Sequence, residues 1–209
     1  MKKRVLILDL DNTIYPVSSI ADKLFGRLFQ LIDEELPEES RHGITKAKDE
    51  LTRRPYQHVA DEFGFGAELT AKGIELLKNI TFNEPMVPYE QYATLQSINI
   101  DKYLVTTGFT KLQTSKVKML GIEADFKGIY IVDPEQSTET KKDVFFKIIK
   151  ENHYTINDVL VIGDDPQSEI KAANELGIDT FLFDPKDMHV NASVTYRSAS
   201  YNSIINIIS

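Results

Sequence analysis

Short apolar runs alternate with stretches of helical spacing along most of the chain. Val5–Leu8 is the first run, and the others lie at 103–105, 129–132, 159–162 and 178–183. Val5–Leu8 and 159–162 are typical of strands buried on both faces of a parallel sheet, and the other runs also predict strands. Helical patterns lie over about 89–97, 111–120, 142–152 and 167–176, and the tail 200–208 is expected to form a further helix. Five strands alternating with helices predict an α/β fold with a right-handed, doubly wound parallel sheet.

The segment between the first two predicted strands has a different character, because it contains helical patterns and no convincing strand. Ile20, Leu24 and Leu28 recur at helical spacing near its start. Further helices are expected to begin at Pro37, Pro55 and Ala67. We therefore predict a core formed by residues 1–16 and 85–209, and an inserted α-helical cap domain formed by residues 17–84.

Composition narrows the classes of protein and site that need to be considered. The chain of 209 residues has a net charge of −8, which argues against an extended nucleic-acid-binding face. It has no cysteine, so disulfides, zinc–thiolate sites and thiol nucleophiles are excluded. No segment approaches the roughly 20 apolar residues that span a bilayer, and the first apolar run is too short for a signal peptide. We expect a soluble, cytoplasmic protein with no nucleic-acid polymer and no membrane as partner, and its oligomeric state is left open.

Polar residues stand where apolar runs end, or in the loops that enter the next helix. They are Asp9, Asp11, Thr106, Lys141, Asp164 and Asp165. Open α/β sheets bind ligands at the carboxyl ends of their strands, so we expect these side chains to converge there. Crowded carboxylates raise each other's pKa, and Mg²⁺, which prefers oxygen ligands, relieves this repulsion. Lysine and threonine add donors for phosphate oxygens, so the set indicates phosphoryl transfer.

These residues resemble, in their order along the chain, the four motifs of the haloacid dehalogenase superfamily. Asp9-Leu-Asp-Asn-Thr13 resembles the first motif, Thr106 the second, Lys141 the third, and Gly163-Asp-Asp-Pro-Gln-Ser-Glu169 the fourth. The resemblance covers roughly residues 3–16 and 85–209, and the helical insert is similar in position to the family's type 1 cap. It implies a Rossmann-like core and a phosphatase activity.

The resemblance also implies a role for each residue. Asp9 would be the nucleophile that forms an aspartyl phosphate, and Asp11 would protonate the leaving oxygen and then activate water. The Asp9 carboxylate, the Asp11 main-chain carbonyl and the Asp164 carboxylate are the expected Mg²⁺ ligands. Thr106 and Lys141 would hold the oxygens of the transferring phosphoryl group.

Some positions depart from the family's pattern or have an alternative. The family usually has aspartate where Glu169 stands, so Glu169 would act on the metal directly, act through a water, or orient Lys141. Lys142 stands beside Lys141 and is the alternative phosphate-binding lysine, although position 141 fits the spacing better. Asp165, which could instead cap the following helix, and Thr107 are weaker site candidates.

The predicted function is therefore a magnesium-dependent phosphatase acting on a small phosphorylated metabolite. Asp11 argues against a dehalogenase, because carbon–halogen cleavage needs no acid for the leaving group. A phosphomutase similar to β-phosphoglucomutase uses the same aspartate pair and is an alternative. An aspartate-phosphorylated signalling domain and a non-catalytic binding module are alternatives from other classes.

The substrate is the least determined part of this prediction. Asp9-Leu-Asp-Asn-Thr-Ile-Tyr-Pro16 resembles the first motif of pyrimidine 5′-nucleotidase-like members, so a nucleoside monophosphate is one candidate. Arg27, Arg53 and Arg54 of the cap are either substrate contacts or part of a solvated helix face, with the solvated face favoured.

Overall fold

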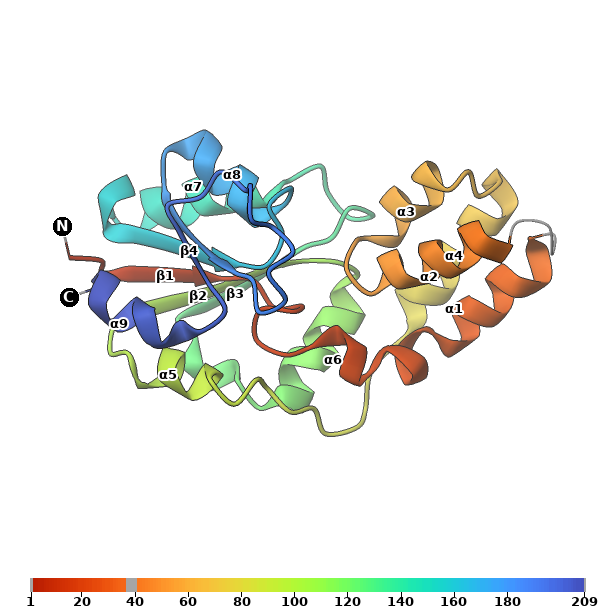
Figure 1. The fold of residues 1–209 in the computed structure, drawn as a ribbon, viewed down its shortest axis with the longest axis horizontal. Coiled ribbons are helices and arrows are strands. Elements are labelled where there is room, and N and C mark those ends of the chain that lie inside the picture. Colours follow the sequence, from red (N-terminus) through yellow and green to blue (C-terminus); the bar gives the residue numbers. More distant parts are fainter. Residues whose placement is uncertain (1, 37–40, 209) are drawn as a thin grey trace.

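A six-stranded parallel sheet forms the centre of the molecule (Figure 1). The computed structural model describes residues 2–36 and 41–208. The strands lie in the order β3-β2-β1-β4-β5-β6. They are β1 (Val5–Leu8), β2 (Asp101–Thr107), β3 (Gly128–Val132), β4 (Val159–Gly163), β5 (Asp179–Phe183) and β6 (Tyr196–Ser198). β1 lies between β2 and β4 in the same direction, so the residues that follow these three strands emerge at one edge of the sheet.

Different helices cover the two faces of this sheet. Val5 and Ile7 belong to one apolar cluster and Leu6 and Leu8 to another, as the period of two along a strand requires. The first cluster contains side chains of α7 (Lys141–Glu151) and α8 (Glu169–Leu176). The second contains side chains of α5 (Tyr92–Ser97), α6 (Thr110–Leu120) and α9 (Ile204–Ile208). In Figure 1 the first pair lies above the sheet and the other three helices lie below it.

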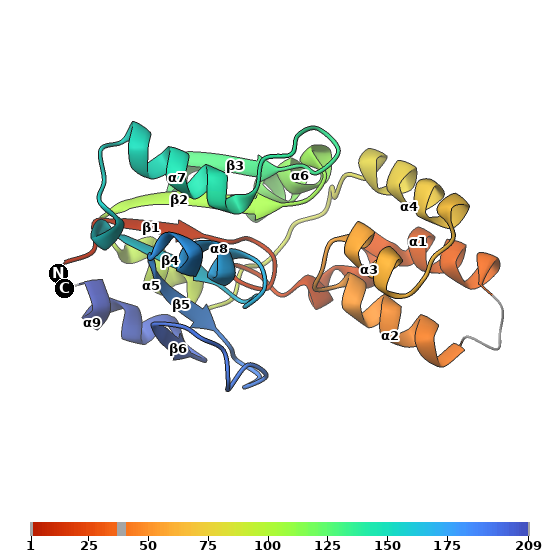
Figure 2. The same cartoon turned by 90° about the horizontal axis from the view of Figure 1, so that it is seen from above.

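Four helices between β1 and β2 gather at one end of the molecule, opposite the two chain termini (Figures 1 and 2). They are α1 (Ala21–Glu35), α2 (Arg41–Leu51), α3 (Tyr56–Glu62) and α4 (Ala67–Asn79). Leu24, Leu28 and Ile32 are buried in α1 at the spacing of one helix face, which confirms the predicted pattern. The helix start predicted at Pro37 lies outside the described residues. The division into core and cap stays a prediction, and we call residues 17–84 the cap.

The structure adds one strand to the five that were predicted. β6 has three residues, and Tyr196 and Arg197 in it are exposed, so it carries no apolar run for a sequence pattern to reveal. The predicted tail helix is also shorter, because a 3₁₀ turn over Tyr201–Ser203 precedes α9. None of the helices described combines the length and apolar character needed to cross a membrane.

Candidate active site

Asp9 and Asp11 lie in a tight loop that directly follows β1. The Asp9 N–H donates to a main-chain oxygen of β4 at 3.0 Å. The Tyr201 hydroxyl donates to the Thr13 carbonyl oxygen at 2.6 Å. Asn12 has a left-handed φ of 56°, which asparagine tolerates better than most residues. The loop is thus held from two sides, and it places a largely buried Asp9 at the carboxyl edge of the sheet.

A buried lysine forms an ion pair with Asp9. Lys141 Nζ lies 2.6 Å from Asp9 Oδ1 and 2.8 Å from Glu169 Oε2, and all three side chains are buried. Thr140 caps α7 together with Asp143, each side chain accepting the other residue's N–H. This capping box fixes the start of α7, and therefore the position of the lysine at its first residue.

The neighbouring Lys142 points elsewhere. Its ammonium pairs with Glu175 at 2.9 Å on the surface. The structure therefore brings Lys141 to Asp9, as the spacing favoured, and leaves Lys142 outside the site. Of the three predicted possibilities for Glu169, the observed contact is the one that orients Lys141.

The corner between β4 and α8 supplies the remaining carboxylates. The Asp165 N–H donates to Glu169 Oε1 at 2.8 Å, and the Thr13 hydroxyl lies 3.4 Å from Asp164 Oδ1. A Cβ on Gly163 would lie 2.1 Å from Glu169 Oε1, so only glycine leaves room for this carboxylate. Glu169, which is 1% exposed, thus joins the loop after β4 to the lysine of α7.

The carboxylates at this edge raise one another's pKa. Burial raises the pKa of Asp9 to about 7 against the opposing charge of Lys141, and the charge of Glu169 adds to the rise. Burial also raises the pKa of Asp164 well above its usual range, with Glu169, Asp9 and Asp165 adding to the effect. Burial acts to lower the pKa of Lys141, but the charges of Asp9 and Glu169 outweigh it and raise that pKa. One buried ammonium therefore faces an excess of negative charge.

This set of donors fits Mg²⁺. Asp9 and Asp164 offer carboxylate oxygens, the ligands that this ion prefers, and a divalent charge would offset the repulsion between them. Within residues 2–36 and 41–208, no three His, Asp or Glu side chains are grouped so that they could hold an ion by themselves. The predicted ligands need only two carboxylates, with the Asp11 main-chain carbonyl and water completing the shell.

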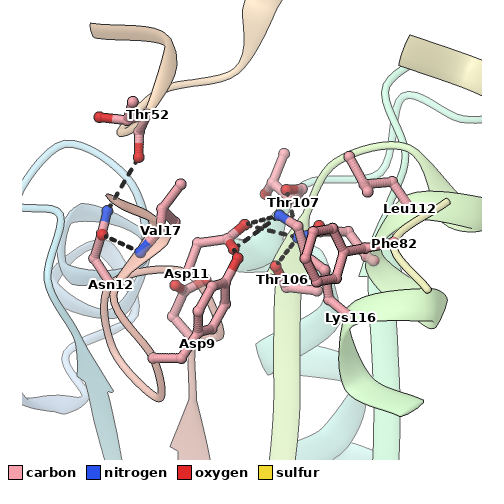
Figure 3. Close-up of polar contacts among 12 residues, drawn as sticks. Asp9, Asp11, Asn12, Val17, Thr52, Phe82, Thr106, Thr107, Leu112 and Lys116 are labelled. Carbon is pink, nitrogen blue, oxygen red and sulfur yellow. Dashed lines mark hydrogen bonds and ion pairs between the residues drawn. The ribbon is translucent and has the colours of Figure 1, made fainter. Parts of the chain in front are cut away.

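Asp11 lies in a cradle of three donor side chains that the sequence analysis did not identify (Figure 3). Lys116 Nζ lies 2.9 Å from Oδ1 and 3.0 Å from Oδ2 of Asp11. Gln113 Nε2 donates to Oδ2 at 3.0 Å, and the Tyr15 hydroxyl donates to Oδ1. Burial acts to raise the pKa of Asp11, but Lys116, Tyr15 and Gln113 outweigh it and hold that pKa below its usual value. Both oxygens of this carboxylate are thus engaged.

Thr106, the second-last residue of β2, lies beside this cradle. It is 1% exposed, and its hydroxyl oxygen accepts a hydrogen bond from Gln113 Nε2 at 2.7 Å. The same nitrogen donates to the main-chain oxygen of Thr107 at 3.3 Å. One amide group therefore connects the end of β2 to the loop that follows β1.

A cavity between the sheet edge and the cap brings the predicted site together. All eight predicted site residues line it: Asp9, Asp11, Thr106, Thr107, Lys141, Asp164, Asp165 and Glu169. The cap contributes mainly apolar side chains, among them Phe25, Leu51, Tyr56 and Leu77. Arg53 and Arg54 line both this cavity and an adjoining one that also contacts His58 and His189. Arg27, the third arginine considered from the sequence, lines neither.

The cradle residues missed from the sequence left a signal on α6. The buried face of this helix contains Leu112, Val117 and Leu120, and also Gln113 and Lys116. Glutamine and lysine are rarely buried without a specific partner. A polar pair three residues apart on an otherwise apolar face therefore marks a contact with something charged, although it does not say with what.

A family model that matches most of the chain identifies the family to which it belongs. The family model described as haloacid dehalogenase-like hydrolase matches residues 3–177. The chain belongs to this family. The resemblance inferred from the motifs is thereby confirmed, and so is the predicted Rossmann-like core.

Two curated relatives of this haloacid dehalogenase-like hydrolase are phosphatases. The chain is 28% identical over 112 residues to pyrimidine 5′-nucleotidase PynA of Streptococcus pneumoniae, which is 52% of this chain and 47% of that protein. It is 27% identical over 99 residues to a ribulose-1,5-bisphosphate 5-phosphatase of Halopiger xanaduensis, which is 47% of this chain and 41% of that protein. The aligned part thus spans less than half the length of either relative.

A solved structure agrees over the whole chain. The crystal structure of HAD-hydrolase YfnB from Bacillus subtilis, described as bound to magnesium, has a TM-score of 0.67 and 21% identity and covers 100% of both chains. At this identity the likeness concerns the fold alone. The fold of this chain is therefore similar over its full length to one already known.

Proposed function

We propose that this haloacid dehalogenase-like hydrolase is a magnesium-dependent phosphatase that cleaves small phosphomonoesters through an aspartyl phosphate on Asp9. The observation that carries the proposal is the second carboxylate, because Asp11 lines the same cavity as Asp9, Thr106 and Lys141. A nucleophile, an acid and donors for phosphoryl oxygens in one cavity meet the requirements of phosphoester cleavage.

In the first half of the reaction, a carboxylate oxygen of Asp9 attacks phosphorus and the bond to the leaving oxygen breaks. The pair with Lys116 holds the pKa of Asp11 low in the free site, and the negative charge of an entering phosphate acts to raise it. Asp11, protonated as the phosphate enters, gives that proton to the leaving oxygen, so the product leaves as an alcohol. The Lys141 ammonium, which lies 2.6 Å from Asp9, and the Thr106 hydroxyl hold the phosphoryl oxygens. Magnesium, held by Asp9, Asp164 and the Asp11 carbonyl, would offset the negative charge of nucleophile and phosphate.

In the second half, a water molecule attacks the phosphorus of the aspartyl phosphate. Asp11, now ionised, takes the proton of the water, and the bond between phosphorus and the Asp9 oxygen breaks. Phosphate leaves, and both carboxyl groups return to their first state. The cap excludes bulk water from the cavity during these steps.

The experiment that tests the proposal is hydrolysis of p-nitrophenyl phosphate with and without Mg²⁺. Wild-type protein should release phosphate only with the metal, and Asp9→Asn should abolish turnover while circular dichroism remains unchanged. Asp11→Asn should accumulate a protein heavier by one phosphoryl group in intact mass spectrometry. Turnover retained by Asp9→Asn would overturn the mechanism.

The same assays separate the alternative functions. A phosphomutase would release little phosphate when given one phosphorylated sugar alone, whereas a phosphatase releases it stoichiometrically. A signalling domain would keep the phosphoryl group on the wild-type protein after a small phosphodonor is removed. A dehalogenase would release halide from a 2-haloacid, which needs no leaving-group acid.

The cavity and one of the two relatives favour a nucleoside monophosphate as the substrate class. Apolar side chains of the cap, among them Phe25 and Tyr56, provide surfaces that suit a flat ring. The relative PynA is described as a pyrimidine 5′-nucleotidase. A panel of nucleoside monophosphates and sugar phosphates at one Mg²⁺ concentration tests this, and equal kcat/KM across the panel would remove the nucleotidase proposal.

A further inference from the structure

Lys116 is a buried cation for which the proposed chemistry has no use. The lysine that contacts the nucleophile is Lys141, whereas the Lys116 ammonium contacts both oxygens of Asp11, at 2.9 and 3.0 Å. Its side chain is 4% exposed. Buried ion pairs are often replaced by apolar residues without loss of stability. Stability alone therefore gives little reason to place an ammonium here.

Gln113 lies one turn before Lys116 on the same face of α6, and it contacts two parts of the site. Its Nε2 donates to Asp11 Oδ2 at 3.0 Å and to the Thr106 hydroxyl oxygen at 2.7 Å. The proposed acid and the proposed phosphate holder thus share one amide nitrogen. A shift of the Gln113 side chain would move Asp11 relative to Thr106.

The backbone near Gln113 leaves space for this contact. Gly108 has a φ of +151°, and a Cβ there would lie 3.1 Å from both Cγ and Cδ of Gln113. The turn between β2 and α6 therefore lets the Gln113 side chain lie against the end of β2. Its close approach is what allows one nitrogen to reach both Thr106 and Asp11.

We infer that Lys116 and Gln113 are positioning residues that hold the Asp11 carboxyl group beside Thr106, so that the acid meets the leaving oxygen of a phosphate held there. This inference rests on the proposed function and deepens it, because it concerns the acid step only. A displaced acid slows protonation of the leaving group and leaves attack by Asp9 unaffected. Removing the Lys116 charge also lets the pKa of Asp11 rise, which favours its protonated form, and we expect the loss from displacement to exceed this gain. The loss in a Lys116 variant should therefore depend on how much the leaving group needs a proton.

Two substrates of similar shape measure this dependence. The leaving group of p-nitrophenyl phosphate is a stable phenolate that needs little proton transfer. The leaving group of benzyl phosphate is an alkoxide unless the acid protonates it. Lys116→Met should lower kcat/KM for benzyl phosphate about tenfold to a hundredfold. The same variant should change kcat/KM for p-nitrophenyl phosphate less than about threefold. Equal losses on both substrates would overturn the inference.

Variants on the same helix provide the controls. Lys118→Met removes an exposed charge of α6 and should leave both substrates unchanged. Lys116→Arg keeps a cation and should recover much of the benzyl phosphate activity. Gln113→Met keeps the ion pair between Lys116 and Asp11, so no buried charge loses its partner. It should therefore fold even if Lys116→Met fails to fold. It should show the same dependence on the leaving group.

A double variant shows whether Lys116 acts through Asp11. In an Asp11→Asn background the acid is absent, so adding Lys116→Met should not slow formation of the phosphorylated protein from benzyl phosphate further. A further loss there would contradict the inference. Failure of the proposed function is distinguishable, because wild-type protein would then hydrolyse neither substrate with Mg²⁺.

Discussion

At the residue scale, Asp164 combines a raised pKa with the absence of a cation of its own. It forms no ion pair among the described residues, and burial together with Glu169, Asp9 and Asp165 raises its pKa. We predict that Asp164→Asn raises the melting temperature of the metal-free protein, by about 2–4 °C for each 1 kcal/mol of repulsion removed. The same change should abolish the increase in melting temperature that Mg²⁺ gives the wild type.

Differential scanning fluorimetry with and without Mg²⁺ measures both effects. Asp61→Asn is a suitable control, because it removes an exposed carboxylate of α3 far from the candidate ligands in sequence. Its response to Mg²⁺ should match that of the wild type. An Asp164→Asn protein that Mg²⁺ stabilises as strongly as the wild type would show that Asp164 is not a ligand.

The buried hydroxyl of Tyr201 allows a prediction of how the free energy of unfolding changes at alkaline pH. Burial raises the pKa of its hydroxyl well above the usual value near 10. Above about pH 10 the unfolded state loses this proton while the folded state keeps it, so the free energy of unfolding falls as pH rises. Tyr201→Phe should reduce that fall.

At pH 7 the same variant should lower the free energy of unfolding by about 1 kcal/mol, because the hydrogen bond to the Thr13 carbonyl is lost. Urea unfolding at pH 7, 10 and 11 measures both, with the exposed Tyr196→Phe as control.

At the scale of elements, the sequence predicted what depends on local pattern. The five apolar runs became β1 to β5. β1 and β4 are buried along their whole length, as strands covered on both faces are, whereas β3 is an edge strand in which only Val132 is buried. β6 was missed because it is a short exposed edge strand held by pairing with β5, and no local pattern encodes that pairing.

The candidate site divides in the same way. Acids at strand ends were predictable, because every strand of a parallel sheet ends at the same edge. The cradle around Asp11 was not, since Lys116 lies 105 residues away from Asp11 and reaches it only through the packing of α6 on the sheet. Polar residues on the buried face of α6 signalled a partner without identifying it.

The corner between β4 and α8 gives a prediction about glycine. A Cβ on Gly163 would lie 2.1–2.4 Å from three atoms of Glu169, so Gly163→Ala must displace that carboxylate from Lys141. We expect lower kcat and a loss of about 1–3 kcal/mol in unfolding free energy. Gly26→Ala in α1 has open space around its Cβ and should instead stabilise by about 1 kcal/mol.

A second change tests whether Glu169 is the reason. Glu169→Ala removes all three colliding atoms, so Gly163→Ala should lose less stability in a Glu169→Ala background than in the wild type. Equilibrium unfolding in urea compares the single and double variants. An equal loss in both backgrounds would place the effect of Gly163→Ala in the backbone and not in Glu169.

At the scale of the whole molecule, the cavity exists only because core and cap meet. The core supplies the carboxylates and Lys141, and the cap supplies apolar side chains together with Arg53 and Arg54. Arg54 is paired with Glu62 at 2.6 Å and with Glu50 at 3.5 Å. The Arg53 side chain has no hydrogen-bond or ion-pair partner among the residues described, and the residue lines both cavities. In a chain of net charge −8, it is a cation available to an anionic substrate.

We therefore predict that Arg53→Met lowers kcat/KM for anionic substrates. A cation at the rim of a site acts mainly on the rate of association, so the loss should be about threefold to tenfold at low salt and should shrink in 0.5 M NaCl. A sugar bisphosphate should lose more than phenyl phosphate, because its second phosphate adds charge near the adjoining cavity that His58 and His189 also line. Arg27→Met removes a cap arginine that lines neither cavity and should change neither substrate. If the two arginine variants behaved alike, Arg53 would be a solvated residue of the turn between α2 and α3, with no contact to substrate.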